Sequence, residues 1–125
     1  MGKKILIVDD EDVVRDFLKC FFENRGYEVA VAGDGAKAFE LVAVFKPEVV
    51  LLDIQMPGMD GLQALKQIKG VYPQVKVIMV TGVGAQAKIE EAKRLGADNY
   101  ITKPLNLACL EKDVREKIEL FSKDS

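Results

Sequence analysis

Val49-Val50-Leu51-Leu52 is the stretch that decides the fold, together with two similar runs, Ile5-Leu6-Ile7-Val8 and Val77-Ile78-Met79-Val80. Each run is short, rich in β-branched or bulky apolar residues, and free of polar alternation. Such runs are typical of strands buried on both faces, which occur in parallel sheets covered by helices. Two runs of mixed polarity, residues 27–31 and 99–102, fit the edges of the same sheet.

Helical patterns lie between these strands, at residues 11–25, 35–45, 61–69, 85–95 and 105–121. Gly26, Gly70 and Gly96 follow three of them and Pro47 follows a fourth, and these residues are ordinary helix stop signals. Five strands that alternate with five helices predict an α/β class, doubly wound sheet with helices on both faces. We expect a single domain over residues 1–125, with its core at about residues 3–121.

The composition excludes several classes of function. The chain has no histidine, so a histidine base, a histidine metal ligand and a phosphohistidine intermediate are closed to it acting alone. A formal net charge of -2 gives no general attraction to nucleic acid or anionic lipid. No segment approaches the ~20 apolar residues of a membrane helix, and no apolar signal segment follows Met1. Cys20 and Cys109 lack zinc or redox spacing and are interpreted as reduced, packed thiols in a cytoplasmic protein.

Polar residues stand where the predicted strands end. Asp9 and Asp10 end the first strand, Asp53 the third, Thr81 the fourth and Lys103 the fifth. In doubly wound sheets, ligands bind beyond the carboxyl ends of the strands. If the first and third strands are neighbours, ~4.8 Å apart, their carboxylates converge and repel each other unless a cation intervenes. Oxygen ligands without His or Cys select a hard ion, and Mg²⁺ is the natural candidate.

Lys103 extends this pattern from metal binding to chemistry. It ends a strand two spacings from Asp53, roughly 9–10 Å away, and its long side chain can cover most of that gap. A metal ion and an ammonium group beside Asp53 would neutralise the oxygens of an incoming phosphoryl group. The Asp53 carboxylate can then act as a nucleophile and form an acyl phosphate. The sequence therefore favours phosphoryl transfer onto aspartate.

Over about residues 3–121 the chain resembles the receiver domain of two-component response regulators. The matching segments, in chain order, are Ile5-Leu6-Ile7-Val8-Asp9-Asp10, Leu51-Leu52-Asp53-Ile54-Gln55-Met56-Pro57-Gly58-Met59-Asp60-Gly61, Val80-Thr81-Gly82 and Tyr100-Ile101-Thr102-Lys103-Pro104. The resemblance is to the chemotaxis-regulator type and implies a flavodoxin-like sheet with strand order 2-1-3-4-5. It also implies Mg²⁺ as the cofactor, with Asp53 as the phosphoacceptor. The implied metal ligands are Asp9, Asp10, Asp53 and the backbone carbonyl of Gln55.

The resemblance also assigns roles at the fourth and fifth strands. Lys103 and Thr81 would contact the phosphoryl oxygens, and Thr81 and Tyr100 would together form the switch. A cis peptide between Lys103 and Pro104 would aim the lysine. Without such a role, Thr81 is a helix N-cap and Tyr100 is a half-buried packing residue. Without a role in metal binding, Asp9 and Asp10 are acids in the first turn of a helix, where they complement the helix dipole.

The implied function is a phosphorylation-dependent signalling module that turns over no external substrate. The resemblance implies a phosphohistidine as the donor. Because the chain has no histidine, the donor would be a separate histidine kinase or histidine phosphotransfer protein, or a small acyl phosphate. The surface formed by helix 4, strand 5 and helix 5 would signal to a downstream effector protein or domain, without direct contact with nucleic acid or membrane. Two alternatives are a small aspartate-nucleophile phosphatase, although Gln55 stands where it needs an acid, and a flavodoxin-like flavin carrier. A receiver that no longer accepts phosphate is a third.

The first helix carries more apolar surface than one buried stripe needs. Its apolar residues span an arc of about 200°, whereas a core-facing stripe is ≳ 100° wide. We expect Val13, Phe17 and Cys20 to form an exposed apolar rim, called here the α1 rim. The hypothesis is that this rim docks the helix that bears the donor's histidine. The alternative is that the final helix of the chain covers it.

Overall fold

The computed structural model of the chain describes residues 3–54, 61–82, 86–102, 106, 108 and 110–123. Five parallel strands form one sheet in the order β2-β1-β3-β4-β5, which confirms the predicted order and places both half-polar strands at the edges. The strands are β1 (Lys4–Val8), β2 (Glu28–Ala32), β3 (Val49–Asp53), β4 (Lys76–Thr81) and β5 (Asn99–Thr102).

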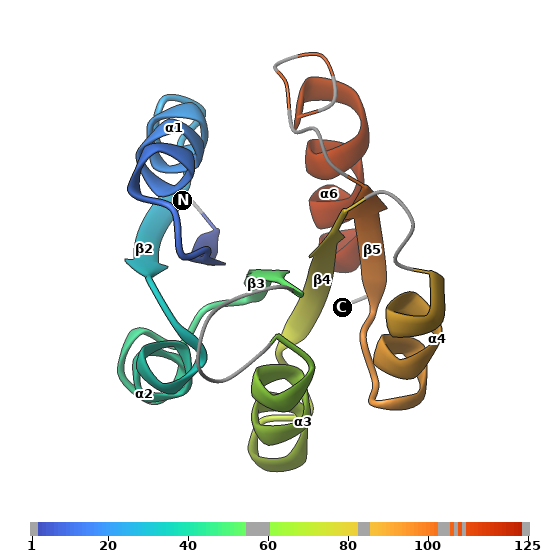
Figure 1. The fold of residues 1–125 in the computed structure, drawn as a ribbon. Helices are drawn as coiled ribbons and strands as arrows, with labels where there is room; N and C mark the ends of the chain where they lie inside the picture. Colours follow the sequence, from blue (N-terminus) through green and yellow to red (C-terminus); the bar gives the residue numbers. More distant parts are fainter. Residues whose placement is uncertain are drawn as a thin grey trace.

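Helices cover both faces of the sheet, so the molecule has three layers (Figure 1). Helices α1 and α6 lie on one face, and α2, α3 and α4 lie on the other (Figure 1). The helices are α1 (Asp12–Glu23), α2 (Gly35–Phe45), α3 (Gly61–Val71), α4 (Gln86–Arg94), the π-helical turn η1 (Leu110–Val114) and α6 (Arg115–Lys123). Among the described residues, no helix is both long and apolar enough to span a bilayer.

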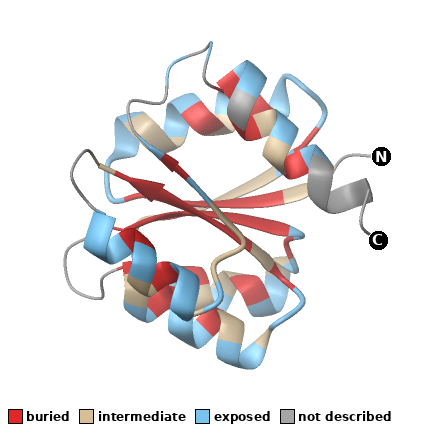
Figure 2. Ribbon diagram, turned by 90° about the vertical axis from the view of Figure 1, so that its right-hand side faces the viewer, coloured by how far each residue is buried: buried red, intermediate tan, exposed pale blue. Residues whose placement is uncertain are grey.

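The core consists of two apolar clusters, one on each face of the sheet. Leu52 and Met79 pack against α2, α3 and α4, whereas Ile7 and Ile78 pack against α1 and the final helix. Figure 2 shows the buried residues concentrated on the strands and on the helix faces turned toward them. This double burial explains why the three central strands are apolar between their polar end residues.

Most helix ends follow the predicted stop signals. Gly26 and Gly96 have φ values of 90° and 103°, a left-handed conformation that glycine adopts without steric cost. Helix α2 ends as predicted before Pro47, with Lys46 in the left-handed region. The prediction that α3 ends at Gly70 was wrong, because the helix continues through Gly70 to Val71. An exposed glycine weakens a helix by only about 0.5–1 kcal/mol, which the buried face of α3 outweighs.

The final helix begins with a π turn that the sequence did not predict. Leu110, Val114 and Ile118 are buried, as their helical spacing predicts, but the first two lie within η1. A hydrogen bond joins the final helix to the residue before β2: the Tyr27 hydroxyl donates to Glu119 Oε2 at 2.7 Å. Leu107 and Phe121 continue the same apolar spacing in the sequence, but their side chains lie outside those that the structure describes.

Candidate functional site

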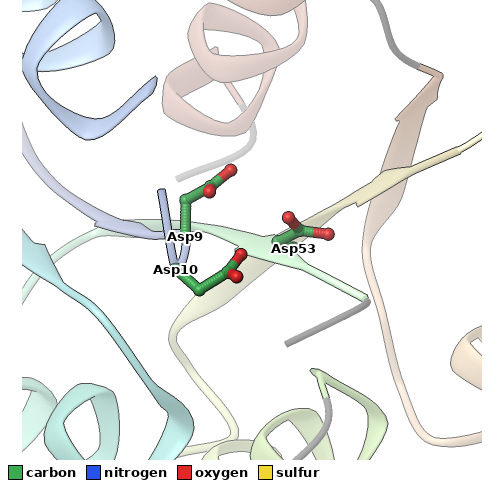
Figure 3. A group of neighbouring side chains, drawn as sticks. All are labelled: Asp9, Asp10 and Asp53. Atoms are coloured by element: carbon green, nitrogen blue, oxygen red, sulfur yellow. The ribbon is translucent and has the colours of Figure 1, made fainter. Parts of the chain in front are cut away.

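Three carboxylates meet at the carboxyl edge of the sheet, as the strand ends predicted. Val8 pairs with Leu52, so Asp9 and Asp53 follow in register on neighbouring strands. Asp9, Asp10 and Asp53 each present one carboxylate oxygen, and these oxygens lie within 4.8 Å of one another. Figure 3 shows the three side chains grouped, with Asp9 and Asp10 after β1 and Asp53 at the end of β3. We call these residues the acidic cluster.

The acidic cluster has the donor chemistry of a hard-cation site. Asp9 and Asp53 are each only 3% exposed, whereas Asp10 is exposed. Like charges at this separation repel, and burial strengthens the repulsion because less water screens them. A cation between them removes the repulsion, and oxygen-only ligands fit Mg²⁺ better than a softer metal. The residues present therefore fit the ion that the sequence predicted.

Asp9 is held by its own loop. Its backbone N–H donates to the Ala32 carbonyl at 3.1 Å, which extends the contact between β1 and β2. Its Oδ1 accepts a hydrogen bond of 2.9 Å from the Glu11 N–H. Helix α1 begins at Asp12, so Asp12 is the acid of the first helical turn. Asp9 and Asp10 lie before that turn, and the alternative interpretation of them as first-turn acids does not hold.

Asp53 is held from the other side by the start of α3. The Ile54 N–H donates to the Val80 carbonyl at 3.0 Å, and the Gly61 N–H donates to the Ile54 carbonyl at 2.8 Å. A Cβ at position 61 would lie 2.2 Å from the Asp53 carbonyl oxygen, so only glycine fits without movement of the backbone. Sequence reasoning included Gly61 in a motif but missed this role. A glycine that opens a helix after a buried strand was the available signal.

Thr81 and Tyr100 lie on the strands beyond Asp53. Asp53 pairs with Val80, so Thr81 ends β4 one residue further along. Thr81 is buried, and its Oγ1 donates a hydrogen bond of 3.4 Å to the Ile101 carbonyl. Tyr100 on β5 is 39% exposed, and the Lys93 ammonium lies 5.0 Å from its ring centroid. A cavity of about 210 Å³ between α4 and β5 is lined in part by Tyr100. Gln55, Lys103 and Pro104 lie outside the described residues.

The α1 rim is exposed, as predicted. Val13 is 79% exposed, Phe17 is 39% exposed, and Cys20 is also exposed, so the final helix does not cover the rim. The interpretation of Cys20 as a packed thiol was wrong: its thiol is free, but α1 buries Leu18, Phe21 and Phe22 instead. Cys109 lies outside the described residues.

Comparison with known proteins identifies the family to which this fold belongs. A family model of the response regulator receiver domain matches residues 5–115. The chain belongs to this family. This receiver domain is 37% identical over 122 residues to sporulation initiation phosphotransferase F of Bacillus subtilis. The aligned residues cover 98% of each of the two chains. The flavodoxin and phosphatase alternatives are not favoured.

Solved structures of other proteins with receiver domains are also similar to this chain. A CheY-like receiver domain protein of Methanospirillum hungatei has a TM-score of 0.91 at 33% identity, with 100% of both chains covered. NtrX of Brucella abortus has a TM-score of 0.90 at 32% identity, with 99% of this chain covered. The present chain spans only 28% of NtrX, so the similarity concerns one part of that longer protein.

Proposed function

We propose that this receiver domain accepts a phosphoryl group on Asp53 from a phosphohistidine of another protein, in a reaction that requires Mg²⁺. The observation that carries the proposal is the acidic cluster, in which two nearly buried carboxylates and one exposed carboxylate share one edge of the sheet. The family supports it, because receiver domains are signalling modules that work with histidine kinases or phosphotransfer proteins and with effector domains. The Bacillus subtilis relative is itself named a phosphotransferase.

Asp9, Asp10, Asp53 and the backbone carbonyl of Gln55 are the proposed ligands of Mg²⁺. When bound, the ion would neutralise charge on the phosphoryl oxygens and on the carboxylates around them. Asp10 is exposed, so it offers the route by which a hydrated cation enters. Asp9 is buried and is oriented by the Glu11 N–H, so its carboxylate is the more rigid of the two.

Asp53 supplies the nucleophile. One carboxylate oxygen forms the new O–P bond while the P–N bond to the donor's imidazole breaks, and the electron pair of that bond stays on the imidazole nitrogen. The acceptor side needs no proton transfer, which suits a chain without a histidine base. Every residue of β3 is buried, so the nucleophile stands on a rigid strand. We propose that Lys103 pairs with the transferred phosphoryl oxygens, aimed by a cis peptide at Pro104.

Thr81 and Tyr100 are the proposed switch. The Thr81 hydroxyl is buried one strand away from Asp53, and its present hydrogen bond is long at 3.4 Å, so a phosphoryl oxygen would be a stronger acceptor. If Thr81 turns toward the phosphoryl group, Tyr100 can move inward beside the α4–β5 cavity. This would change the surface formed by α4, β5 and the final helix, where an effector protein or domain would bind.

The α1 rim is the proposed docking surface for the donor's histidine-bearing helix. It lies on the helix that starts at Asp12, two residues after Asp10, so a partner on the rim reaches the acidic cluster. We expect Phe17→Ala to slow transfer from the partner and leave phosphorylation by acetyl phosphate unchanged. Val44→Ala is the matched control, because Val44 is 79% exposed on α2, which covers the other face. Unchanged transfer by Phe17→Ala would contradict the docking hypothesis.

We further propose that the chain is one domain that acts in the cytoplasm and catalyses only its own phosphorylation and dephosphorylation. The two core clusters belong to one sheet, and no second core lies within the described ranges. An assay with an external phosphomonoester checks the second part, since steady release of phosphate in excess of protein would contradict it.

Mass spectrometry after incubation with acetyl phosphate tests the main proposal. We expect wild type to gain the mass of one phosphoryl group with Mg²⁺ present and to stay unmodified with a chelator. Asp53→Ala should stay unmodified in both conditions. Glu40→Gln is the control, because Glu40 is an exposed carboxylate on α2. Modification of Asp53→Ala at the wild-type level would overturn the proposal.

A further inference from the structure

We propose that Arg15 is a positioning residue that sets the geometry of Asp9 and Asp10 for Mg²⁺. This inference rests on the proposed function, and it concerns a residue that the sequence analysis did not single out. Arg15 lies in the second turn of α1 and touches none of the phosphoryl chemistry itself. Its effect would pass through the loop that carries two of the three carboxylates.

The guanidinium of Arg15 holds this loop at two points. Nη1 donates a hydrogen bond of 2.6 Å to the carbonyl oxygen of Asp9. Nη2 donates to the carboxylate of Asp12 in the first turn of α1. The Asp9 carbonyl belongs to the planar peptide unit that joins Asp9 to Asp10. A donor fixed on that oxygen therefore fixes how the two carboxylates are turned relative to each other.

The packing around Arg15 makes this contact rigid. Its side chain is only 18% exposed, although Asp12 is 83% exposed. A Cβ at Gly33 would lie 3.2 Å from Nη1, so the guanidinium packs closely against the main chain after β2. That chain segment is also joined to Asp9, because the Asp9 N–H donates to the Ala32 carbonyl. Arg15 thus connects α1, the loop after β1 and the loop after β2.

Two roles for Arg15 predict opposite effects on Mg²⁺ affinity. As a simple positive charge near the acidic cluster, Arg15 would offset the carboxylates and oppose a second cation. Its removal would then tighten Mg²⁺ binding. As a positioning residue, it keeps two ligands in a binding geometry, and its removal would weaken Mg²⁺ binding. Groups that orient metal ligands typically change metal affinity by about 10–100-fold when mutated.

Titration of the ¹⁵N-labelled protein with magnesium chloride, followed by NMR, separates these roles and also shows whether each variant is folded. Arg15→Met removes the charge and both donors while it keeps an unbranched side chain. Arg15→Lys keeps the charge but cannot reproduce the planar two-point contact. Arg94→Met is the matched control, because Arg94 also pairs with an acid three residues before it, on α4.

We expect Arg15→Met to bind Mg²⁺ about tenfold more weakly than wild type, the lower end of the usual range, because its contact is to the main chain. Arg15→Lys should also bind more weakly, and Arg94→Met should match wild type. Affinity of Arg15→Met equal to or tighter than wild type would overturn the inference. If Arg15→Met does not fold, wild-type affinity in Arg15→Lys would overturn it. Failure of wild type itself to bind Mg²⁺ would instead contradict the proposed function.

Discussion

Replacement of Gly61 with alanine tests how closely α3 approaches the proposed phosphoacceptor. The added Cβ would lie 2.2 Å from the Asp53 carbonyl oxygen and 2.6 Å from the Cα of Ile54. Non-bonded carbon atoms are best separated by about 3.5–4.0 Å, so the helix or the end of β3 must move by roughly 1 Å. Because both contacts are to main-chain atoms, no change of side-chain rotamer can relieve them.

The expected loss of free energy of unfolding in Gly61→Ala has two contributions. Overpacking in a tightly packed region costs about 1–3 kcal/mol. The movement also weakens the 2.8 Å hydrogen bond from the Gly61 N–H to the Ile54 carbonyl, which is worth about 1 kcal/mol. We therefore expect Gly61→Ala to lower the free energy of unfolding by about 2–4 kcal/mol. For a domain of this size, that corresponds to a fall in Tm on the order of 10 °C.

Gly70→Ala is the matched control in the same helix. A Cβ at Gly70 meets no atom within 4 Å, and Gly70 is exposed. The same substitution should therefore stabilise the protein by about 0.5–1 kcal/mol, because alanine loses less backbone entropy than glycine in a helix.

Urea unfolding followed by circular dichroism measures both variants. Phosphorylation by acetyl phosphate should be slower in Gly61→Ala and unchanged in Gly70→Ala, since only the first displaces the main chain at Asp53. If Gly61→Ala were as stable as wild type, or if both variants shifted alike, the argument for a close backbone contact would be refuted.

Three further predictions concern contacts made by residues outside the acidic cluster. Lys69→Met should lower the free energy of unfolding by about 1–3 kcal/mol in urea, since it leaves the Asp98 carboxylate without an ammonium that lies 2.7 Å away and is largely buried. Asp34→Ala should cost about 1 kcal/mol in the same assay, because the Asp34 side chain accepts a backbone N–H of the first turn of α2. Burial, and then the hydrogen bond to Glu119, raises the pKa of Tyr27 above the ordinary value of 10.0. The contribution of Tyr27 to stability is therefore complete below pH 10 and is lost as the pH rises through the raised pKa. Tyrosinate absorbance and unfolding, both measured against pH, should show this loss. In Tyr27→Phe the loss should be absent.

The acidic cluster was predictable because it depends on features that a sequence shows directly. Buried parallel strands are recognisable as unbroken apolar runs, and their carboxyl ends meet at one edge. Asp9, Asp10 and Asp53 follow such runs, so their convergence needed only the neighbour relation of β1 and β3. The α1 rim followed from a similar count, because the apolar arc of α1 is wider than one sheet can cover.

The remaining features depend on distances that no local pattern contains. Gly70 is a residue type that commonly ends a helix, yet α3 continues through it because Ile68 in the same turn is buried. The contact of Arg15 with Gly33 joins helix α1 to the loop after β2, and an arginine in a helix otherwise resembles a solvated charge. Each of these required the packed structure.

The proposed acceptor and the proposed switch differ in how firmly the fold holds them. Asp53 ends a strand that is buried throughout, between β1 and β4, and the first residue of α3 packs on its main chain. Tyr100 stands on the edge strand β5, where only one residue is buried, beside a cavity. Thr81 lies between them, with a long hydrogen bond to β5. Phosphorylation at Asp53 would add charge at the end of a fully buried strand, so we expect the response on the side of the sheet toward β5, where Thr81 has a long hydrogen bond and Tyr100 is partly exposed.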